Sequence, residues 1–229
     1  MTTAIDMAMV AALIGDPARA NILSALTDGR AQTATELAFA ARVSPQTTSG
    51  HLAKLTEAQL LSVNKQGRHR YYRLASPLVG RMLEAVMAVA AVAPARHRSP
   101  SRIDDALRRA RTCYDHLAGR LGVALADALI AKQGIVLGED GGEVTGEGER
   151  ILTGFGIDIA TAGQQRRTFC RPCIDWSERR PHLAGSIGAA LASRCFELGW
   201  IERQRDSRAV TVTRRGRRGF ADTFDLTLP

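Results

Sequence analysis

The segment from Ser44 to Leu61, with the sequence SPQTTSGHLAKLTEAQLL, constrains the fold of this chain most strongly. Ser44 is a preferred N-cap residue, and Pro45 follows at the first helical position, where its missing N–H costs nothing. An apolar stripe then recurs at helical spacing, formed by Leu52, Leu55 and Leu60. The segment therefore predicts a helix that begins after Ser44 and packs its leucines on a core.

Signals for further elements surround this helix. Upstream, Asp16 precedes Pro17 as an N-cap, and Thr33 and Glu36 have the spacing of a capping box, so two helices are expected. Downstream, LLSVNKQGRHRYYRL contains two alternating segments around Gly67, which predicts a β-hairpin. SPLVGRMLEAVMAVAAV then predicts a strongly apolar helix, typical of a helix that packs on a partner chain.

The helix after Ser44 and the hairpin carry side chains that could contact DNA. The N-terminal half of the helix presents short hydrogen-bonding side chains, which suit insertion into the major groove. The hairpin tip is basic and could hold the phosphate backbone. The candidate DNA-binding residues are Ser44, Gln46, Thr47, Thr48, Ser49, His51, Lys54, Lys65, Arg68, His69, Arg70, Tyr72 and Arg73.

Residues 4–92 resemble the ArsR-type winged helix-turn-helix repressors in the order of their helices and in the segments SPQTTSGHLAKLTEAQLL and KQGRHRYYRL. The resemblance implies that Ser44–Lys54 is the recognition helix and Lys65–Arg73 the wing. It also implies a homodimer that represses a promoter until an effector releases it, and we expect such a dimer to bind a palindromic double-stranded operator. Gln59 departs from the glycine that usually follows the recognition helix in this family, so a less sharply capped helix end is expected.

The metal sites that this family uses do not carry over to the present chain. They lie on the helix before the recognition helix or on the terminal dimer helix. Here the corresponding segments, 33–41 and 77–92, contain neither cysteine nor histidine. Since a soft or borderline metal requires thiolate or imidazole ligands, any sensing is expected elsewhere.

The charge of the chain favours partners that carry phosphate groups, and its hydropathy argues against contact with a membrane. The formal net charge is +8 and the sequence pI is about 10.0, with arginine supplying nearly all of the positive charge, which favours phosphate-bearing partners. The apolar run 7–15 follows Asp6 rather than a basic segment, and the run 85–95 is shorter than the ~20 residues that span a bilayer. We therefore expect a cytoplasmic protein without membrane contact, whose cysteines are thiols or ligands rather than disulfides.

A length of 229 residues predicts two domains, and the segment APARHRSPSR marks a boundary between them. We expect a DNA-binding and dimerisation domain over residues 1–93, a linker over 94–102 and a sensing domain over 103–229.

The second half contains an internal repeat, because HLAGRLGVALA begins at His116 and HLAGSIGAALA begins at His182. Each copy predicts a helix, a hairpin and a short helix. The Gly-x-x-Gly pairs at 119 and 122 and at 185 and 188 would let the two repeat helices cross closely. The predicted fold class is mainly α with small β-hairpins (α+β). It combines an N-terminal winged helix-turn-helix with a C-terminal domain of two winged-helix-like repeats.

The cysteines of the second half allow three interpretations. Cys113 and Cys173 precede the two repeat helices at equivalent places and could be buried structural residues. They could instead hold zinc or another soft or borderline metal between the repeats, or act as thiols made reactive by nearby arginines. Cys195 lies among apolar neighbours and predicts a core residue. The candidate sensing residues are Cys113, His116, Cys170, Cys173 and His182.

These observations predict a DNA-binding transcriptional repressor, released by a metal ion, a thiol-reactive species or a small molecule sensed in the C-terminal half. One alternative is a constitutive DNA-binding protein whose second half only dimerises. Another is a thiol oxidoreductase using Cys170 and Cys173, but such chemistry usually sits on a βαβ scaffold that this chain lacks. We expect no enzyme. The basic segment 201–218 could be a second DNA contact, a solvated face, or a dock for the acidic segment 138–149.

Overall fold

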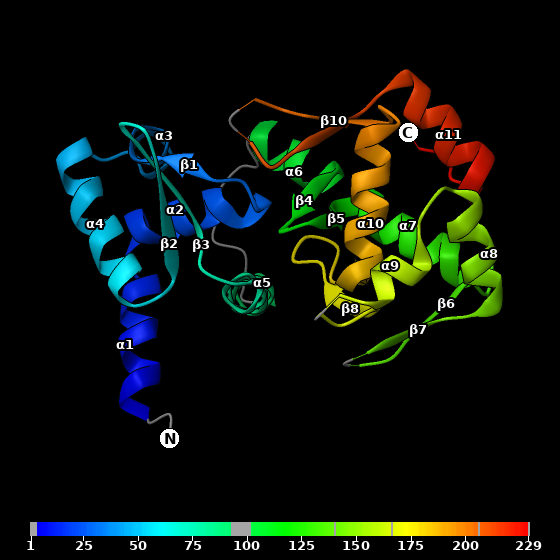
Figure 1. Ribbon diagram of the computed structural model, residues 1–229, viewed down its shortest axis with the longest axis horizontal. Coiled ribbons are helices and arrows are strands. Elements are labelled where there is room, and N and C mark those ends of the chain that lie inside the picture. Colours follow the sequence, from blue (N-terminus) through cyan, green and yellow to red (C-terminus); the bar gives the residue numbers. More distant parts are fainter. Residues whose placement is uncertain (1–3, 93–101, 140, 166, 206, 229) are drawn as a thin grey trace. The chain divides into compact units, whose positions relative to one another are not determined.

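The computed structural model describes residues 4–92, 102–139, 141–165, 167–205 and 207–228 (Figure 1). The chain divides into two compact units, Met1–Leu83 and Glu84–Pro229. Most of the expected linker, residues 94–102, lies outside the described residues, and the predicted domain boundaries stay a prediction.

The first unit is a bundle of short helices with a small antiparallel sheet. Its strands lie in the order β1–β3–β2, and the β2–β3 hairpin runs in register from Leu61 opposite Leu74 to Gln66 opposite His69. Its elements are α1 (Ala4–Ile14), α2 (Pro17–Ala25), a 3-10 turn (Leu26–Asp28), β1 (Gln32–Thr33), α3 (Ala34–Ala41), α4 (Pro45–Glu57), β2 (Leu61–Gln66) and β3 (His69–Leu74).

The helix starts of this unit follow the predicted capping signals. The Asp16 side chain accepts a hydrogen bond from the Arg19 N–H at the start of α2. Thr33 forms a capping box with Glu36 before α3, and the Ser44 hydroxyl accepts from the Thr47 N–H before α4. Each cap satisfies a backbone donor that the helix itself leaves unpaired, so the boundaries are fixed locally.

The core of the first unit forms where the apolar faces of the helices meet the hairpin. As predicted, Leu52, Leu55 and Leu60 of the leucine stripe are buried. The other fully or nearly fully buried side chains of this core include Ile22, Leu23, Leu26, Leu37, Leu61 and Leu74. Burial of this stripe leaves the opposite face of α4 exposed to solvent.

Helix α4 ends sharply although it lacks a glycine there. Gln59 takes the left-handed conformation with φ 57 that glycine normally occupies. The Gln59 N–H donates to the Thr56 carbonyl and the Leu60 N–H donates to the Leu55 carbonyl, which is the Schellman pattern. The expectation of a less sharply capped end is therefore wrong, because both hydrogen bonds form even though Gln59 must adopt a strained backbone conformation.

We expect Gln59→Gly to raise the free energy of unfolding by about 0.5–1 kcal/mol, because glycine adopts φ > 0 without strain. Chemical denaturation measures the difference. The matched control is Gly199→Ala, since Gly199 has φ 63 at the end of α10 (Gly185–Glu197) and a Cβ there would meet no neighbour within 4 Å. This control should lose a similar amount, and a gain there would contradict the backbone argument.

The second unit consists of helices and two-stranded hairpins (Figure 1). Helix α5 (Pro77–Val92) crosses the division between the units. The hairpins are β4 (Arg111–Cys113) with β5 (His116–Ala118), β6 (Ile135–Leu137) with β7 (Gly142–Val144), β8 (Arg171–Ile174) with β9 (Pro181–Ala184), and β10 (Ile201–Arg203) with β11 (Val210–Val212). The remaining helices are α6 (Arg102–Arg109), α7 (Gly119–Ala131), α8 (Gly146–Gly154), α9 (Ile159–Gly163), α10 (Gly185–Glu197) and α11 (Arg214–Phe224).

The elements of this unit recur in the same order. A hairpin, a helix, a second hairpin and a further helix run from β4 to α8 and again from β8 to α11. The two copies interlock: the Thr112 N–H donates to the Arg208 carbonyl, and the Gly142 N–H donates to the Cys170 carbonyl. The second hairpin of each copy therefore forms a hydrogen bond with the edge of the first hairpin of the other copy, β10–β11 with β4–β5 and β6–β7 with β8–β9.

The glycines of the repeated segment make room for strands rather than for a helix crossing. Helix α7 packs on β9 and helix α10 packs on β5. A Cβ at Gly122 would lie 2.4 Å from the Leu117 carbonyl oxygen and 3.5 Å from the His182 Cβ. A Cβ at Gly188 would lie 2.4 Å from the Leu183 carbonyl oxygen and 3.2 Å from the His116 Cβ. Each helix thus approaches the histidine of the opposite repeat closely.

A continuous apolar core joins the two copies. It runs along α7 and α10 and ends in a group of aromatic rings around Trp200, whose centroid lies 5.0 Å from those of Phe155 and Phe220. Cys195 is fully buried in this core, as predicted. The core fixes both first hairpins against the two helices and so positions their inward-facing side chains.

Candidate functional sites

Helix α4 and the β2–β3 hairpin present the predicted polar and basic residues to solvent. Gly67 takes φ 59 in the two-residue turn, which lets the hairpin tip turn tightly. His51 is half-buried, and its Nδ1 lies 3.5 Å from the Arg19 Nη1. The exposed members of the predicted set are Ser44, Gln46, Thr47, Ser49, Lys54, Lys65, Arg68, His69, Arg70 and Arg73.

Two residues of the predicted set do not belong to this surface. Thr48 is fully buried, and its hydroxyl donates to the Ser44 carbonyl within the helix. Tyr72 is 8% exposed because β3 is the central strand of its sheet and this residue faces the core. The predicted DNA-binding set contains Thr48 and Tyr72 because sequence position alone does not show which side of a short helix or strand faces the core.

The first hairpin of each copy places one cysteine opposite one histidine. Cys113 pairs with His116 across β4 and β5, and Cys173 pairs with His182 across β8 and β9. Side chains directly opposite each other in an antiparallel pair project from the same face. The sequence repeat therefore produces two equivalent Cys–His pairs, although the second turn is longer than the first.

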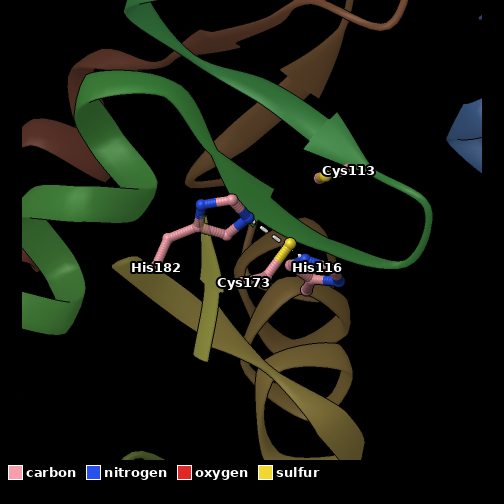
Figure 2. A group of neighbouring side chains, drawn as sticks. All are labelled: Cys113, His116, Cys173 and His182. Atoms are coloured by element: carbon pink, nitrogen blue, oxygen red, sulfur yellow. Dashed lines mark hydrogen bonds between the residues drawn. The ribbon is translucent and has the colours of Figure 1, made fainter. Parts of the chain in front are cut away.

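The four side chains of these pairs meet in one buried cluster, the Cys–His centre (Figure 2). One potential ligand atom from each of Cys113, His116, Cys173 and His182 lies within 4.8 Å of the others. In Figure 2 the imidazole rings and the Cys173 sulfur point toward one another. Cys170, the fifth predicted residue, lies outside this group and packs in the apolar core, where burial raises the pKa of its thiol to about 11.

The imidazole rings face each other through the same ring nitrogen. The two Nε2 atoms lie 3.2 Å apart, and the rings stack with centroids 5.1 Å apart. Behind them, Asp115 Oδ1 lies 3.2 Å from His116 Nδ1, and Asp175 Oδ2 lies 3.4 Å from His182 Nδ1, the latter too poorly aligned for a hydrogen bond. A carboxylate beside Nδ1 favours a proton there and leaves the Nε2 lone pair for a cation.

A single proton can serve the two facing nitrogens. Burial alone would lower the pKa of His116, but its hydrogen bonds with Asp115 and Cys173 raise that pKa to about 9. Burial lowers the pKa of His182. The favoured state thus has a protonated His116 whose Nε2–H donates to a neutral His182. A metal ion would take the place of this proton.

The two sulfurs share a buried carboxylate. The Cys113 thiol donates to Glu84 Oε1 at 2.9 Å, and the Cys173 thiol donates to Glu84 Oε2 at 3.1 Å. Burial raises the pKa of Glu84 to about 7. The hydrogen bond between the cysteines lowers the pKa of Cys173 and raises that of Cys113, so Cys173 is the thiol that ionises first.

A buried ion pair between Arg111 and Asp175 holds the aspartate that lies beside His182. Arg111 Nη2 donates to Asp175 Oδ2 at 2.9 Å, and both side chains are fully buried. The Gly119 N–H also donates to Asp175 Oδ2, at 2.6 Å. Although burial would raise the pKa of Asp175, the charge of Arg111 lowers it to about 2.

The other histidine has a corresponding support. Arg167 forms an ion pair with Asp115 and donates to the Gly185 carbonyl at 2.9 Å. In each copy, therefore, the aspartate beside the histidine is tied to the helix start of the opposite copy. Asp115 and Asp175 could have been identified from the repeated Cys-x-Asp of the sequence, and Glu84 from its place as the only acidic residue in the apolar segment 77–92.

Two sulfurs and two imidazole nitrogens form a donor set typical of tetrahedral zinc and of other soft or borderline metals. Histidines that bind metal through Nε2 commonly have a carboxylate beside Nδ1, as both histidines have here. Because all four donors are buried, little solvent would compete for a bound ion.

Comparison with known proteins gives the family. A helix-turn-helix domain model matches residues 14–64. The HTH-type transcriptional regulator YdfF of Bacillus subtilis (strain 168) is 44% identical over 224 residues, which cover 97% of this chain and 99% of the relative. The chain therefore belongs to the HTH-type transcriptional regulators.

Solved structures resemble part of the chain. One is the homodimeric winged helix-turn-helix DNA-binding domain of a possible ArsR-family regulator from Mycobacterium bovis, 28% identical over 38% of this chain and 79% of that chain, with a TM-score of 0.35. Another is NolR from Sinorhizobium fredii, 27% identical over 38% of this chain and 85% of that chain, with a TM-score of 0.35. Among the described residues, no helix is long and apolar enough to cross a membrane.

Proposed function

We propose that this transcriptional regulator is a homodimeric repressor whose operator binding is released by a thiophilic divalent metal ion of the zinc class. The Cys–His centre carries this proposal, because four metal-binding side chains from two hairpins converge in a buried place. A thiol-reactive effector would need the two thiols alone, whereas a metal ion also accounts for the two imidazoles that converge with them.

Helix α5 supports a homodimer. Among the side chains of this helix that the structure describes, three large apolar ones are exposed: Leu78 at 65%, Val86 at 45% and Val89 at 74%. A second copy of the chain would remove such side chains from water. A twofold dimer would hold two α4 helices about 34 Å apart, one turn of B-DNA, which matches a palindromic operator.

The charge and shape of the first unit support operator binding through α4 and the wing. The exposed face of α4 carries hydrogen-bonding side chains such as Gln46 and Ser49, which can reach base edges. The wing adds Lys65, Arg68 and Arg70, whose charges suit phosphate contacts that position the protein without reading sequence.

A binding experiment tests the proposal directly. Duplexes would be selected from a random library by the full-length protein after metal removal, and their binding would be followed by fluorescence anisotropy during zinc addition. We expect release of the duplex as about one zinc ion binds each chain, with elemental analysis giving the bound metal. Zinc binding without release would favour a constitutive DNA-binding protein with a structural metal. Failure to bind zinc would overturn the metal proposal.

We expect Arg70→Ala to weaken binding to every duplex and to reduce the slope of log K against log salt by about 0.9, the value of one lost phosphate contact. Gln46→Ala should instead change base preference, at about 1–3 kcal/mol for a good base contact. The salt titration of both variants measures these effects. Arg215→Ala, which removes an exposed arginine of α11, is the matched control for charge. An equal slope change in this control would assign DNA contact to the second unit.

A further inference from the structure

We propose that Glu84 and a bound metal ion exclude each other at Cys113 and Cys173, so that metal binding displaces Glu84 and with it the helix α5. This inference rests on the proposed function and names the step by which occupancy of the Cys–His centre reaches the rest of the chain. The observation that supports this inference is the contact of one buried carboxylate, that of Glu84, with both sulfurs.

The geometry makes Glu84 a competitor for the sulfurs. Its two oxygens each accept one thiol, at 2.9 Å from Cys113 and 3.1 Å from Cys173, and its side chain is 8% exposed. Both sulfurs are thus engaged by a single group on another element. Glu84 is also the only acidic residue of α5, so no neighbouring carboxylate on that helix can replace it.

A sulfur that coordinates a metal does so as thiolate and has no proton left to donate. Metal binding therefore removes both hydrogen bonds that hold the Glu84 carboxylate. A buried carboxylate without donors, next to two thiolates, is costly in a medium of low dielectric constant. Unless the carboxyl group takes up a proton and donates it to a sulfur, as an amide N–H would, it must leave its place, and the backbone of α5 that carries it must adjust.

Helix α5 is the element for which such an adjustment matters. Its first residues, 77–83, belong to the first unit, and the helix also carries the exposed Leu78, Val86 and Val89. A ligand shifts an equilibrium only through contacts that differ between two states. The contact between Glu84 and the sulfurs is such a difference, since it exists only without metal.

The first test compares wild type with Glu84→Gln and the control Glu143→Gln, an exposed residue of β7. Zinc affinity is measured by competition with a chromophoric chelator, and release of the selected duplex by anisotropy. The amide that Glu84→Gln introduces can accept from thiols and donate to metal-bound sulfurs, so it can stay in place. We expect Glu84→Gln to bind zinc on the order of tenfold more tightly and to lose zinc-driven release, while the control behaves as wild type.

Each result decides between alternatives. Weaker zinc binding by Glu84→Gln would show that Glu84 is itself a ligand and would overturn displacement. Unchanged affinity with normal release would overturn it too and leave the proposed function intact. A wild-type protein that binds no zinc would overturn both. Unchanged melting of the metal-free variant would show that the exchange of carboxylate for amide leaves the fold intact.

Hydrogen–deuterium exchange of the full-length protein supplies a second readout. We expect zinc to increase the exchange rate of amides in peptides covering residues 84–92 severalfold in wild type and not in Glu84→Gln, because only the wild-type helix loses its anchor. Equal or greater protection of these amides in zinc-bound wild type would overturn the inference.

Discussion

Cys173→Ser should lower zinc affinity by at least about a hundredfold and abolish release of the operator by zinc, while operator binding without metal stays unchanged. Removal of an outer-shell partner already costs about 10–100-fold in metal proteins, and loss of a thiolate ligand costs more. Cys173 is the stronger choice of the two cysteines, because its pKa is lowered and that of Cys113 is raised. Chelator competition and anisotropy measure the two effects.

The matched control is Cys170→Ala, which removes the other cysteine of the Cys-x-x-Cys motif. Cys170 lies in the apolar core outside the Cys–His centre, so its loss should leave zinc affinity unchanged. If instead Cys173→Ser lowered thermal stability and left any release by zinc unchanged, the cysteines would be structural. Equal loss of zinc binding in both variants would move the site to the motif itself.

Arg111→Met should lower the free energy of unfolding of the second unit by about 3–5 kcal/mol, because it leaves a buried carboxylate without its counter-charge. Asp175 is fully buried and ionised, with its pKa lowered to about 2 chiefly by the charge of Arg111. The variant also loses the contact of the guanidinium with Trp176, whose ring centroid lies 4.6 Å away. Urea unfolding followed by tryptophan fluorescence measures the change.

Arg180→Met supplies the comparison, since it breaks an ion pair of the same residue types at the surface. Arg180 and Asp127 are 58% and 42% exposed, so their pair should contribute within about 0.5 kcal/mol. A loss for Arg111→Met no larger than that of this control would mean that Asp175 finds other compensation, for instance from the Gly119 N–H alone.

The first unit could be predicted in detail because its signals are local. Caps at Asp16, Thr33 and Ser44 involve atoms three residues apart, and the structure contains all of them. Whether a single side chain faces the core or the solvent was harder to predict. Thr48 and Tyr72 are buried because their sides of α4 and β3 face the core, which a polar or aromatic residue type does not reveal.

The Cys–His centre was partly predictable because the internal repeat relates residues that are far apart in the sequence. The equivalence of Cys113 and Cys173 in sequence allowed a shared site between the repeats as one interpretation, and the structure brings the two residues together. The predicted sensing set includes Cys170 because of its spacing from Cys173. Cys170 comes just before β8, however, and its side chain packs in the apolar core rather than beside Cys173. Glu84 stands out in the sequence as the only acidic residue of segment 77–92, but it lies 29 residues from Cys113 and has no counterpart in the repeat, so only the fold shows that it contacts the sulfurs.

The pairing of one cysteine with one histidine in each hairpin has a further consequence for the history of such a domain. Each copy holds two potential ligands, half of a tetrahedral donor set, and its aspartate is connected to the helix start of the other copy. A single copy would therefore have been complete only as a pair of identical chains. Duplication and fusion of that ancestor would convert an intermolecular site into an intramolecular one, and would free one half to vary. The longer second turn, which carries Trp176, is a variation that only a fused pair can keep in one half.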